Sequence, residues 1–346
     1  MKLLRTKSFI YSWLLFISIF NLYSQNNKID ELLKKSHSEN SFNGNVLVMQ
    51  NDIVIYENFY GFVDATKNST LNTKHQFMIG SIYKEFPAVA IMQLQEKNLL
   101  SINDSISKFI PNLPIWGKSI TIKNLLQYAS GLPKINWRNY FSKGILPTNE
   151  LLFKEIVNTS SLAFTPGTDY LYTNASPILL IRIIENISKL DFETYLTQNI
   201  FTPNGLKNIK LQNEFPFSDK KNMAIPFNHD LKEDPYKLKA KHVLFTSDTK
   251  DLYHWFSLLA NHKIISKKSL QFLSKTVKEG EHIQSPLGNC TWENDTLIQQ
   301  SHHGSSGNYE CLVQRFNEDN ICIVILTNQK NRNVFELSTK ILNMIR

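Results

Sequence analysis

The sequence predicts an α/β (α+β) fold: both ends of the chain build one antiparallel sheet with flanking helices, and a mostly helical subdomain is inserted between them. Strand-like segments lie near both ends of the 346 residues, and the middle shows helical periodicity punctuated by prolines. No internal repeat disturbs this order. Because 42% of the residues are hydrophobic, the chain can bury a large core. We expect a cleft at the seam between the sheet and the helical part.

The N-terminal elements are predicted to be a helix and a hairpin. Residues 28–40 read as a helix, because apolar residues recur at helical spacing from Ile29. Residues 45–50 and 53–60 are rich in strand-forming residues, and Asn51-Asp52 between them is a turn signal.

The middle of the chain is predicted to be helical. A helix begins near Ser81 and extends to about Leu99, and Pro87 removes a backbone donor close to its start. We therefore expect an irregular or kinked first turn. Further helices are expected over residues 104–109, 121–129, 149–157, 175–188 and 191–199.

The C-terminal part returns to strands. Helices are expected at 248–261 and 267–275, strands at 287–292, 296–302, 309–316 and 321–327, and a last helix at 332–345. The sheet part therefore covers about residues 25–80 and 245–346, and the helical part about 81–244.

Residues 1–24 have the pattern of a secretory signal peptide. Three basic residues before position 8 precede an apolar run of about a dozen residues, Phe9 to Phe20, and the small residue Ser24. An uncleaved anchor is the alternative, although a membrane span needs about 20 apolar residues. In both cases we expect the domain of residues 25–346 to be exported to the periplasm or secreted, with a membrane contact only if the segment stays uncleaved.

The charge of the chain gives little support to nucleic-acid binding. Without the three basic residues of segment 1–24, 35 Lys and Arg face 30 Asp and Glu, a net charge of +5. These charges are scattered, and no basic block is interleaved with aromatic residues.

The three cysteines, Cys290, Cys311 and Cys322, are an odd number without a CxxC pair. We expect them to be small buried strand residues. Cys311 and Cys322 are unequally far from the turn of their hairpin, so they should not face each other.

A first catalytic candidate is the pair Ser81 and Lys84. At a spacing of three residues their side chains lie on one face of a helix. A serine is a weak nucleophile until a base takes its proton, and a neutral lysine can act as that base. The start of the helix also directs backbone N–H groups toward developing negative charge.

A second candidate is the pair Tyr172 and Asn174, after a Pro-Gly turn. Separated by one residue, they point the same way on an extended loop. A phenol can shuttle a proton, and an amide can bind both the lysine and a substrate amide. Tyr170 is a competing tyrosine for which we expect a structural role.

A third candidate is the segment His302-His303-Gly304-Ser305 on a predicted strand. Its glycine would let a substrate backbone approach, and a main-chain N–H could complete an oxyanion hole. Adjacent histidines on a strand point to opposite faces, so they cannot easily share a metal ion. We therefore expect no metal site.

The order SxxK, YxN, HxG resembles the serine β-lactamase and penicillin-binding-protein superfamily, in the branch with class C β-lactamases, D-alanyl-D-alanine carboxypeptidases and esterases. Further matching segments extend the resemblance over nearly the whole mature chain: Phe42 to Val48, Ile79 to Lys84, Ile120 to Leu126 with Ser130 to Pro133, and Phe164 to Asn174. The resemblance implies a β-lactamase/transpeptidase-like fold.

The resemblance also implies roles for the site residues. Ser81 would be acylated, Lys84 would assist its deprotonation, and Tyr172 would relay protons. Asn174 would bind Lys84 and the substrate amide, and the amides of Ser81 and Ser305 would form the oxyanion hole. His302 would stand where class C enzymes have a lysine, and no metal or cofactor would be needed.

Two departures from the family pattern bear on the substrate. His302 replaces that lysine and weakens a fixed positive charge for a substrate carboxylate, and residues 210–245, which help to shape the acyl pocket, are short and rich in charge. Two others are expected to be structural: Tyr128 stands where the family usually has histidine, and Pro87 disturbs the helix just after Lys84.

We therefore expect an exported serine hydrolase that acts through an acyl-enzyme on an ester, a D-amino-acid peptide or a β-lactam. D,D-peptidase or esterase activity is favoured over true β-lactamase activity, and the partner is a small molecule or short peptide, such as one derived from peptidoglycan. The alternative is a penicillin-binding-like protein that holds cell-wall peptide with little or no turnover. The intact set Ser81, Lys84, Tyr172 and Asn174 argues against it.

Overall fold

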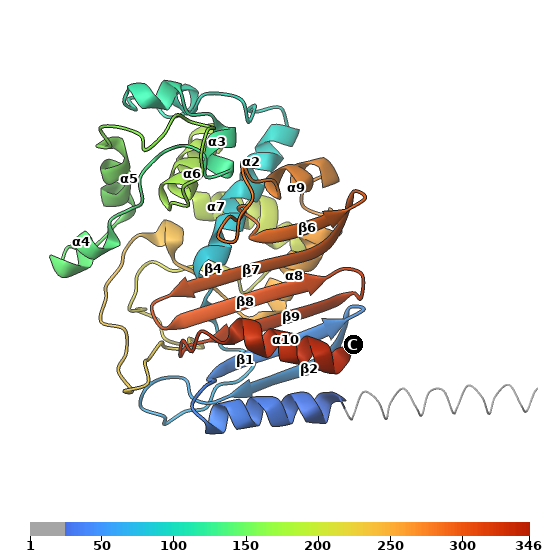
Figure 1. Ribbon diagram of the computed structural model, residues 1–346. Coiled ribbons are helices and arrows are strands. Elements are labelled where there is room, and N and C mark those ends of the chain that lie inside the picture. The colour runs from blue at the N-terminus through green and yellow to red at the C-terminus, as the bar shows by residue number, and fades with distance from the viewer. Residues whose placement is uncertain (1–24) are drawn as a thin grey trace, which may run out of the picture.

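The computed structural model describes residues 25–346, and the expected signal peptide lies outside them. A helix over residues 25–38 leads into a six-stranded antiparallel sheet with the order β2-β1-β9-β8-β7-β6 (Figure 1). Its strands are β1 (Gly44–Gln50), β2 (Ile53–Tyr60), β6 (Asn289–Glu293), β7 (Thr296–Ser306), β8 (Tyr309–Phe316) and β9 (Ile321–Thr327). The expected antiparallel sheet built from both ends of the chain is confirmed.

The first and last strands are neighbours in the middle of the sheet. β1 pairs with β9 from Gly44 opposite Thr327 to Gln50 opposite Ile321. This pairing closes the fold, because it joins segments that are almost the whole chain apart.

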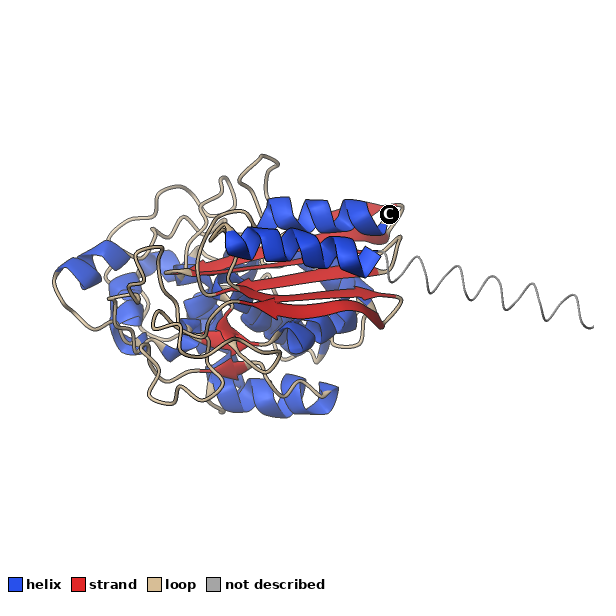
Figure 2. Cartoon of the chain, turned by 90° about the horizontal axis from the view of Figure 1, so that it is seen from below, coloured by secondary structure: helices blue, strands red, loops and turns tan. Residues whose placement is uncertain are grey.

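Different helices cover the two faces of the sheet. Helix 25–38 and α10 (Val334–Ile345) pack on the face to which Val46 and Val48 point, and Figure 2 shows both helices on one side of the strands. Leu47 and Met49, on the other face, pack into the core that contains α8 (Thr249–Ala260). The alternation of β1 therefore supplies both layers.

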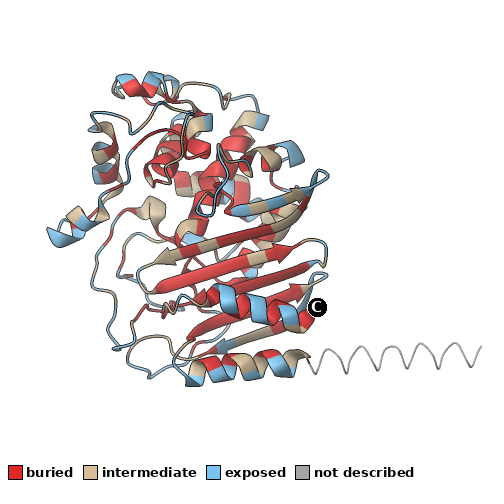
Figure 3. Cartoon of the chain, viewed as in Figure 1, coloured by how far each residue is buried: buried red, intermediate tan, exposed pale blue. Residues whose placement is uncertain are grey.

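The inserted part packs on the second face and shares its core. Its helices are α2 (Glu85–Glu96), α3 (Ile122–Leu126), α4 (Trp137–Ser142), α5 (Asn149–Val157), α6 (Ala175–Ser188) and α7 (Phe192–Leu196), followed by a π-helical turn, Thr197–Phe201. A further helix, α9 (Lys267–Leu273), belongs to the C-terminal part of the chain. One buried cluster contains side chains of both the sheet and the helices. Figure 3 shows buried residues along the strands and along the helices next to them.

Short elements were not predicted. A small three-stranded sheet joins β3 (Phe77–Met78), β5 (Phe245–Ser247) and β4 (Lys210–Leu211). Single 3₁₀ turns cover Ile115–Lys118, Thr202–Asn204 and Lys241–Val243, and the helix expected at 104–109 is only the 3₁₀ turn Ile106–Lys108.

The helix expected from Ser81 to Leu99 differs at both ends. It begins with a 3₁₀ turn, η1 (Gly80–Lys84), and ends at Glu96, because Asn98 turns the chain with φ +58°. Pro87 lies in the first turn of α2, where a backbone N–H has no partner within the helix. The expected irregular start is thus confirmed, and the expected end was wrong by three residues.

The three cysteines are free thiols, and Cys311 and Cys322 are both buried. In the pairing of β8 with β9, Cys311 lies opposite Leu326, and Cys322 lies opposite Arg315. The expectation that the two do not face each other is confirmed. Across residues 25–346, no helix is both long and apolar enough to cross a membrane.

Candidate active site

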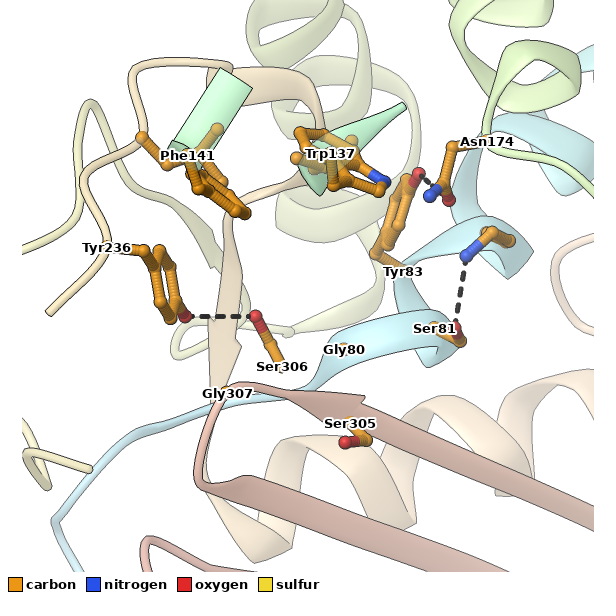
Figure 4. A pocket seen from close by; sticks show the side chains of 13 residues that line it. Gly80, Ser81, Tyr83, Trp137, Phe141, Asn174, Tyr236, Ser305, Ser306 and Gly307 are labelled. Atoms are coloured by element: carbon orange, nitrogen blue, oxygen red, sulfur yellow. Dashed lines mark hydrogen bonds between the residues drawn. The ribbon is translucent and has the colours of Figure 1, made fainter. Parts of the chain in front are cut away.

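A cavity of about 350 Å³ lies at the seam between the sheet and the helical part (Figure 4). One side is η1, with Ser81 and Lys84, next to the end of β7 with Ser305 and Ser306. The rest of the lining is aromatic and apolar: Tyr83 of the same turn, and Trp137, Phe141, Tyr236, Leu238 and Val243. A cleft at the seam was expected, and it contains the first candidate pair.

Ser81 and Lys84 contact each other. Lys84 Nζ donates a hydrogen bond to Ser81 Oγ at 3.1 Å, and only 3% of Lys84 is exposed. The same Nζ lies over two aromatic rings, 4.7 Å from the centroid of Tyr83 and 4.9 Å from that of Tyr172. The 3₁₀ turn therefore holds an amine against a serine hydroxyl in a largely desolvated setting.

Two glycines bring the backbone before Ser81 against strand β7. Gly80 has φ +51°, and a Cβ there would lie 2.2 Å from the backbone nitrogen of Ser305. A Cβ on Gly304 would lie 1.9 Å from the carbonyl oxygen of Ile79. Only glycine permits this approach. It places the backbone segment that contains the Ser81 amide next to the segment of β7 that contains the Ser305 amide.

Tyr172 lies beside Lys84; the residue is half-buried, its hydroxyl is buried, and it is not among the residues that line the cavity. Its hydroxyl has no hydrogen-bond partner among the described residues, and its ring lies 4.7 Å from that of Tyr128. Tyr128 is itself buried, and burial raises the pKa of its phenol well above 10. The neighbouring Tyr170 donates its hydroxyl to the carbonyl of Gln284 at 3.2 Å, in keeping with a structural role.

Asn174 lies just before α6 and lines the cavity. Its Oδ1 accepts a hydrogen bond from the hydroxyl of Tyr83 at 3.4 Å. Burial raises the pKa of Tyr83 well above 10, so this phenol stays a donor. Asn174 was expected to bind Lys84. In the structure its side-chain oxygen instead binds Tyr83, the residue before Lys84.

His302 and His303 point to opposite faces of β7, as expected. His302 is buried and places Nδ1 2.6 Å from Oε1 of Glu85, which follows Lys84 in the chain. His303 faces the other layer, with Nε2 3.0 Å from Oε1 of Glu310. His302 therefore lies behind the nucleophile turn and is not among the residues that line the cavity.

Several residues of the site were not predicted as such. The signal that could have indicated Glu85 is its place as an acid directly before the apolar stretch from Phe86 to Met92. The aromatic residues between 116 and 141 suit either a cleft or the core by sequence alone. Trp137 and Phe141 line the cavity, whereas Trp116 and Tyr140 are buried in the core.

Three comparisons with known proteins fit this geometry. The family model described as Beta-lactamase matches residues 28–343. Penicillin-binding protein 4* of Bacillus subtilis (strain 168) is 24% identical over 335 residues, which cover 89% of this chain and 73% of that protein.

Two solved structures share the fold. FmtA from Staphylococcus aureus superposes with a TM-score of 0.76 at 20% identity, over 93% of this chain and 90% of the other. The D-amino acid amidase from Ochrobactrum anthropi SV3 has a TM-score of 0.75 at 18% identity, over 93% and 98%. Since the family model spans nearly all the described residues, the chain belongs to the beta-lactamase family, which unites serine β-lactamases with penicillin-binding proteins.

Proposed function

We propose that the chain is an exported serine hydrolase that forms an acyl-enzyme on Ser81, with D,D-peptidase or esterase activity rather than true β-lactamase activity. The 3.1 Å contact between Lys84 Nζ and Ser81 Oγ is the observation that carries this proposal. A buried amine against a serine hydroxyl is the arrangement of a base that activates a nucleophile.

In the proposed reaction, each of these groups has one task. Ser81 Oγ attacks the carbonyl carbon of the substrate while its proton passes to neutral Lys84. The backbone amides of Ser81 and Ser305 donate to the oxyanion that forms. Tyr172 passes its proton to the leaving group and receives from Lys84 the proton that came from Ser81, and the carbon–heteroatom bond breaks to leave an ester on Ser81. Water then attacks this ester along the same proton path and releases the acid.

The lining of the cavity supports an acyl group with a bulky apolar part. The rings of Trp137 and Phe141 are stacked with their centroids 6.2 Å apart, and the ring centroids of Phe141 and Tyr236 are 5.5 Å apart. At the position where class C enzymes have a lysine, His302 points to Glu85 and offers no fixed charge to a substrate carboxylate. An ester or a peptide with an apolar D-residue, such as a peptidoglycan-derived fragment, suits this site better than an anionic β-lactam.

The test is intact-mass spectrometry of the purified protein after treatment with a fluorophosphonate and, separately, with a penicillin. We expect a stable fluorophosphonate adduct on the wild type and none on Ser81→Ala. Penicillin hydrolysis is followed in parallel, because rapid turnover would hide an adduct. Penicillin labelling would favour a peptidase over an esterase. If neither reagent labels Ser81 or is consumed, the hydrolase proposal fails and a binding protein for cell-wall peptide becomes the better account.

The proposed export has its own readout. Protein recovered from its native cells should have the mass of a chain that starts after Ser24, if residues 1–24 are a cleaved signal peptide. A mass that includes these residues would indicate an uncleaved anchor.

A further inference from the structure

Behind the nucleophile turn lies a buried pair, Glu85 and His302, that the reaction above does not use. Both side chains are buried, and Oε1 of Glu85 lies 2.6 Å from Nδ1 of His302. Oε2 of the same carboxyl accepts a hydrogen bond from Nε1 of Trp255 at 2.6 Å, and Nε2 of Gln300 lies 3.3 Å from Oε1. Three donors from α8 and β7 thus converge on one acid.

A buried acid at this position is costly for the fold. Burial raises the pKa of Glu85 above its usual value, while the hydrogen bonds from His302, Trp255 and Gln300 lower it. A buried ionisable pair is often no more stable than well-packed apolar residues of the same volume. An acid kept beside Lys84 therefore points to a task in the reaction.

We propose that Glu85 is a positioning residue: by accepting a hydrogen bond from Nδ1, it fixes the ring and the tautomer of His302, and the pair holds the turn that carries Ser81 and Lys84 against strand β7. This inference rests on the proposed function. A carboxylate can only accept at this position, so the Nδ1 proton is fixed by the geometry. His302 lies two residues before Gly304, so the ring is anchored next to the contact between β7 and η1.

Two other titratable groups near the pair keep their protons at neutral pH. Tyr128 and Cys290 lie close enough to Glu85 to interact electrostatically with it. Burial raises the pKa of Cys290 to about 12 and that of Tyr128 well above 10. Near neutral pH, the thiol and the phenol therefore add no charge to the pair.

The test compares wild type with Glu85→Gln, Glu85→Asp, His302→Gln and the double variant Glu85→Gln/His302→Gln. The amide of Glu85→Gln can donate to Nδ1 and so reverse the tautomer of His302. We expect the rate of fluorophosphonate labelling at Ser81 to fall by about 10–100-fold, the size typical when the partner that orients a histidine is removed. Glu85→Asp, which keeps the carboxylate, should recover part of the rate.

Two readouts separate this role from a merely structural one. In the His302→Gln background, Glu85→Gln should cause no further loss, because the two residues act as one unit. Nuclear magnetic resonance of protein with ¹⁵N-labelled histidine should show His302 protonated at Nδ1 in the wild type and at Nε2 in Glu85→Gln. This second signal does not depend on any substrate.

His303→Gln is the matched control, because it removes a histidine–glutamate pair of similar geometry, 3.0 Å apart, from the opposite face of the same strand. It should label at the wild-type rate. Equal labelling of wild type and a folded Glu85→Gln, or losses that add in the double variant, would overturn the positioning role alone. A wild type that takes no label would overturn the proposed function and the positioning role with it.

Discussion

Tyr172 carries a hydroxyl that is buried and has no hydrogen-bond partner among the described residues. A buried polar group without a partner costs about 1–3 kcal/mol, so its presence is not explained by stability. A proton-relay role explains it, because the partner would be the substrate or the leaving group.

Tyr172→Phe should therefore separate activity from stability. We expect the turnover of a small ester to fall by about 10²–10⁴-fold, the usual worth of a general acid–base group. The free energy of unfolding should stay the same or rise, since the variant removes an unsatisfied hydroxyl. Ester hydrolysis and urea unfolding measure the two effects.

Tyr170→Phe is the control, because its hydroxyl bonds to the backbone of Gln284, as acceptor from the nitrogen and donor to the oxygen. That variant should lose about 1 kcal/mol of stability and keep its activity. The opposite pattern, with Tyr170 needed for turnover and Tyr172 dispensable, would reassign the relay.

The sequence was informative where a site depends on local spacing. The contact of Ser81 with Lys84 could be predicted because three residues separate them on one turn. The contact of Glu85 with His302 spans 217 residues, and no local pattern reports such a pair. The hydrogen bond of Asn174 with Tyr83 was missed for the same reason.

At the scale of single elements, long apolar segments were predicted best. α6, β8 and β9 have the predicted bounds, because buried runs between clear turn signals leave few alternatives. β3, β4 and β5 have only two or three residues each, too few for any periodicity. The sequence likewise could not place α4, whose aromatic residues suited either the core or a cleft.

Helix α4 leads to a prediction about substrate selection. Phe141 is 40% exposed and lines the cavity, so Phe141→Ala should leave the fold intact. We expect kcat/KM for a phenylacetyl ester to fall about 5–30-fold relative to an acetyl ester, which corresponds to the loss of about 1–2 kcal/mol of aromatic contact.

Leu146→Ala is the matched control, since Leu146 lies in the loop after α4, is 36% exposed and does not line the cavity. Its ratio of phenylacetyl to acetyl rates should equal that of the wild type. Equal ratios for Phe141→Ala and wild type would show that the acyl group does not contact this wall.

At the scale of the whole molecule, the sheet and the helical insertion share one core. Leu47 and Val324 of the central strands belong to the same buried cluster as Leu179 and Ile183 of α6. The pairing of β1 with β9 closes the sheet only when both ends of the chain are in place. Neither part can therefore complete its core alone, and we expect the two to unfold together.

Ile341→Ala tests this cooperativity from the far face of the sheet. Ile341 of α10 is buried in the second cluster, which contains no residue of the helical insertion. Removal of a buried isoleucine side chain should cost about 2–5 kcal/mol. In hydrogen exchange under native conditions, the slowest amides of β9 and those of α6 should lose protection by the same free energy, because both open only in global unfolding. If β9 loses protection while α6 keeps it, the helical insertion is a separate folding unit, and the seam that contains Ser81 is a boundary between two units rather than the interior of one.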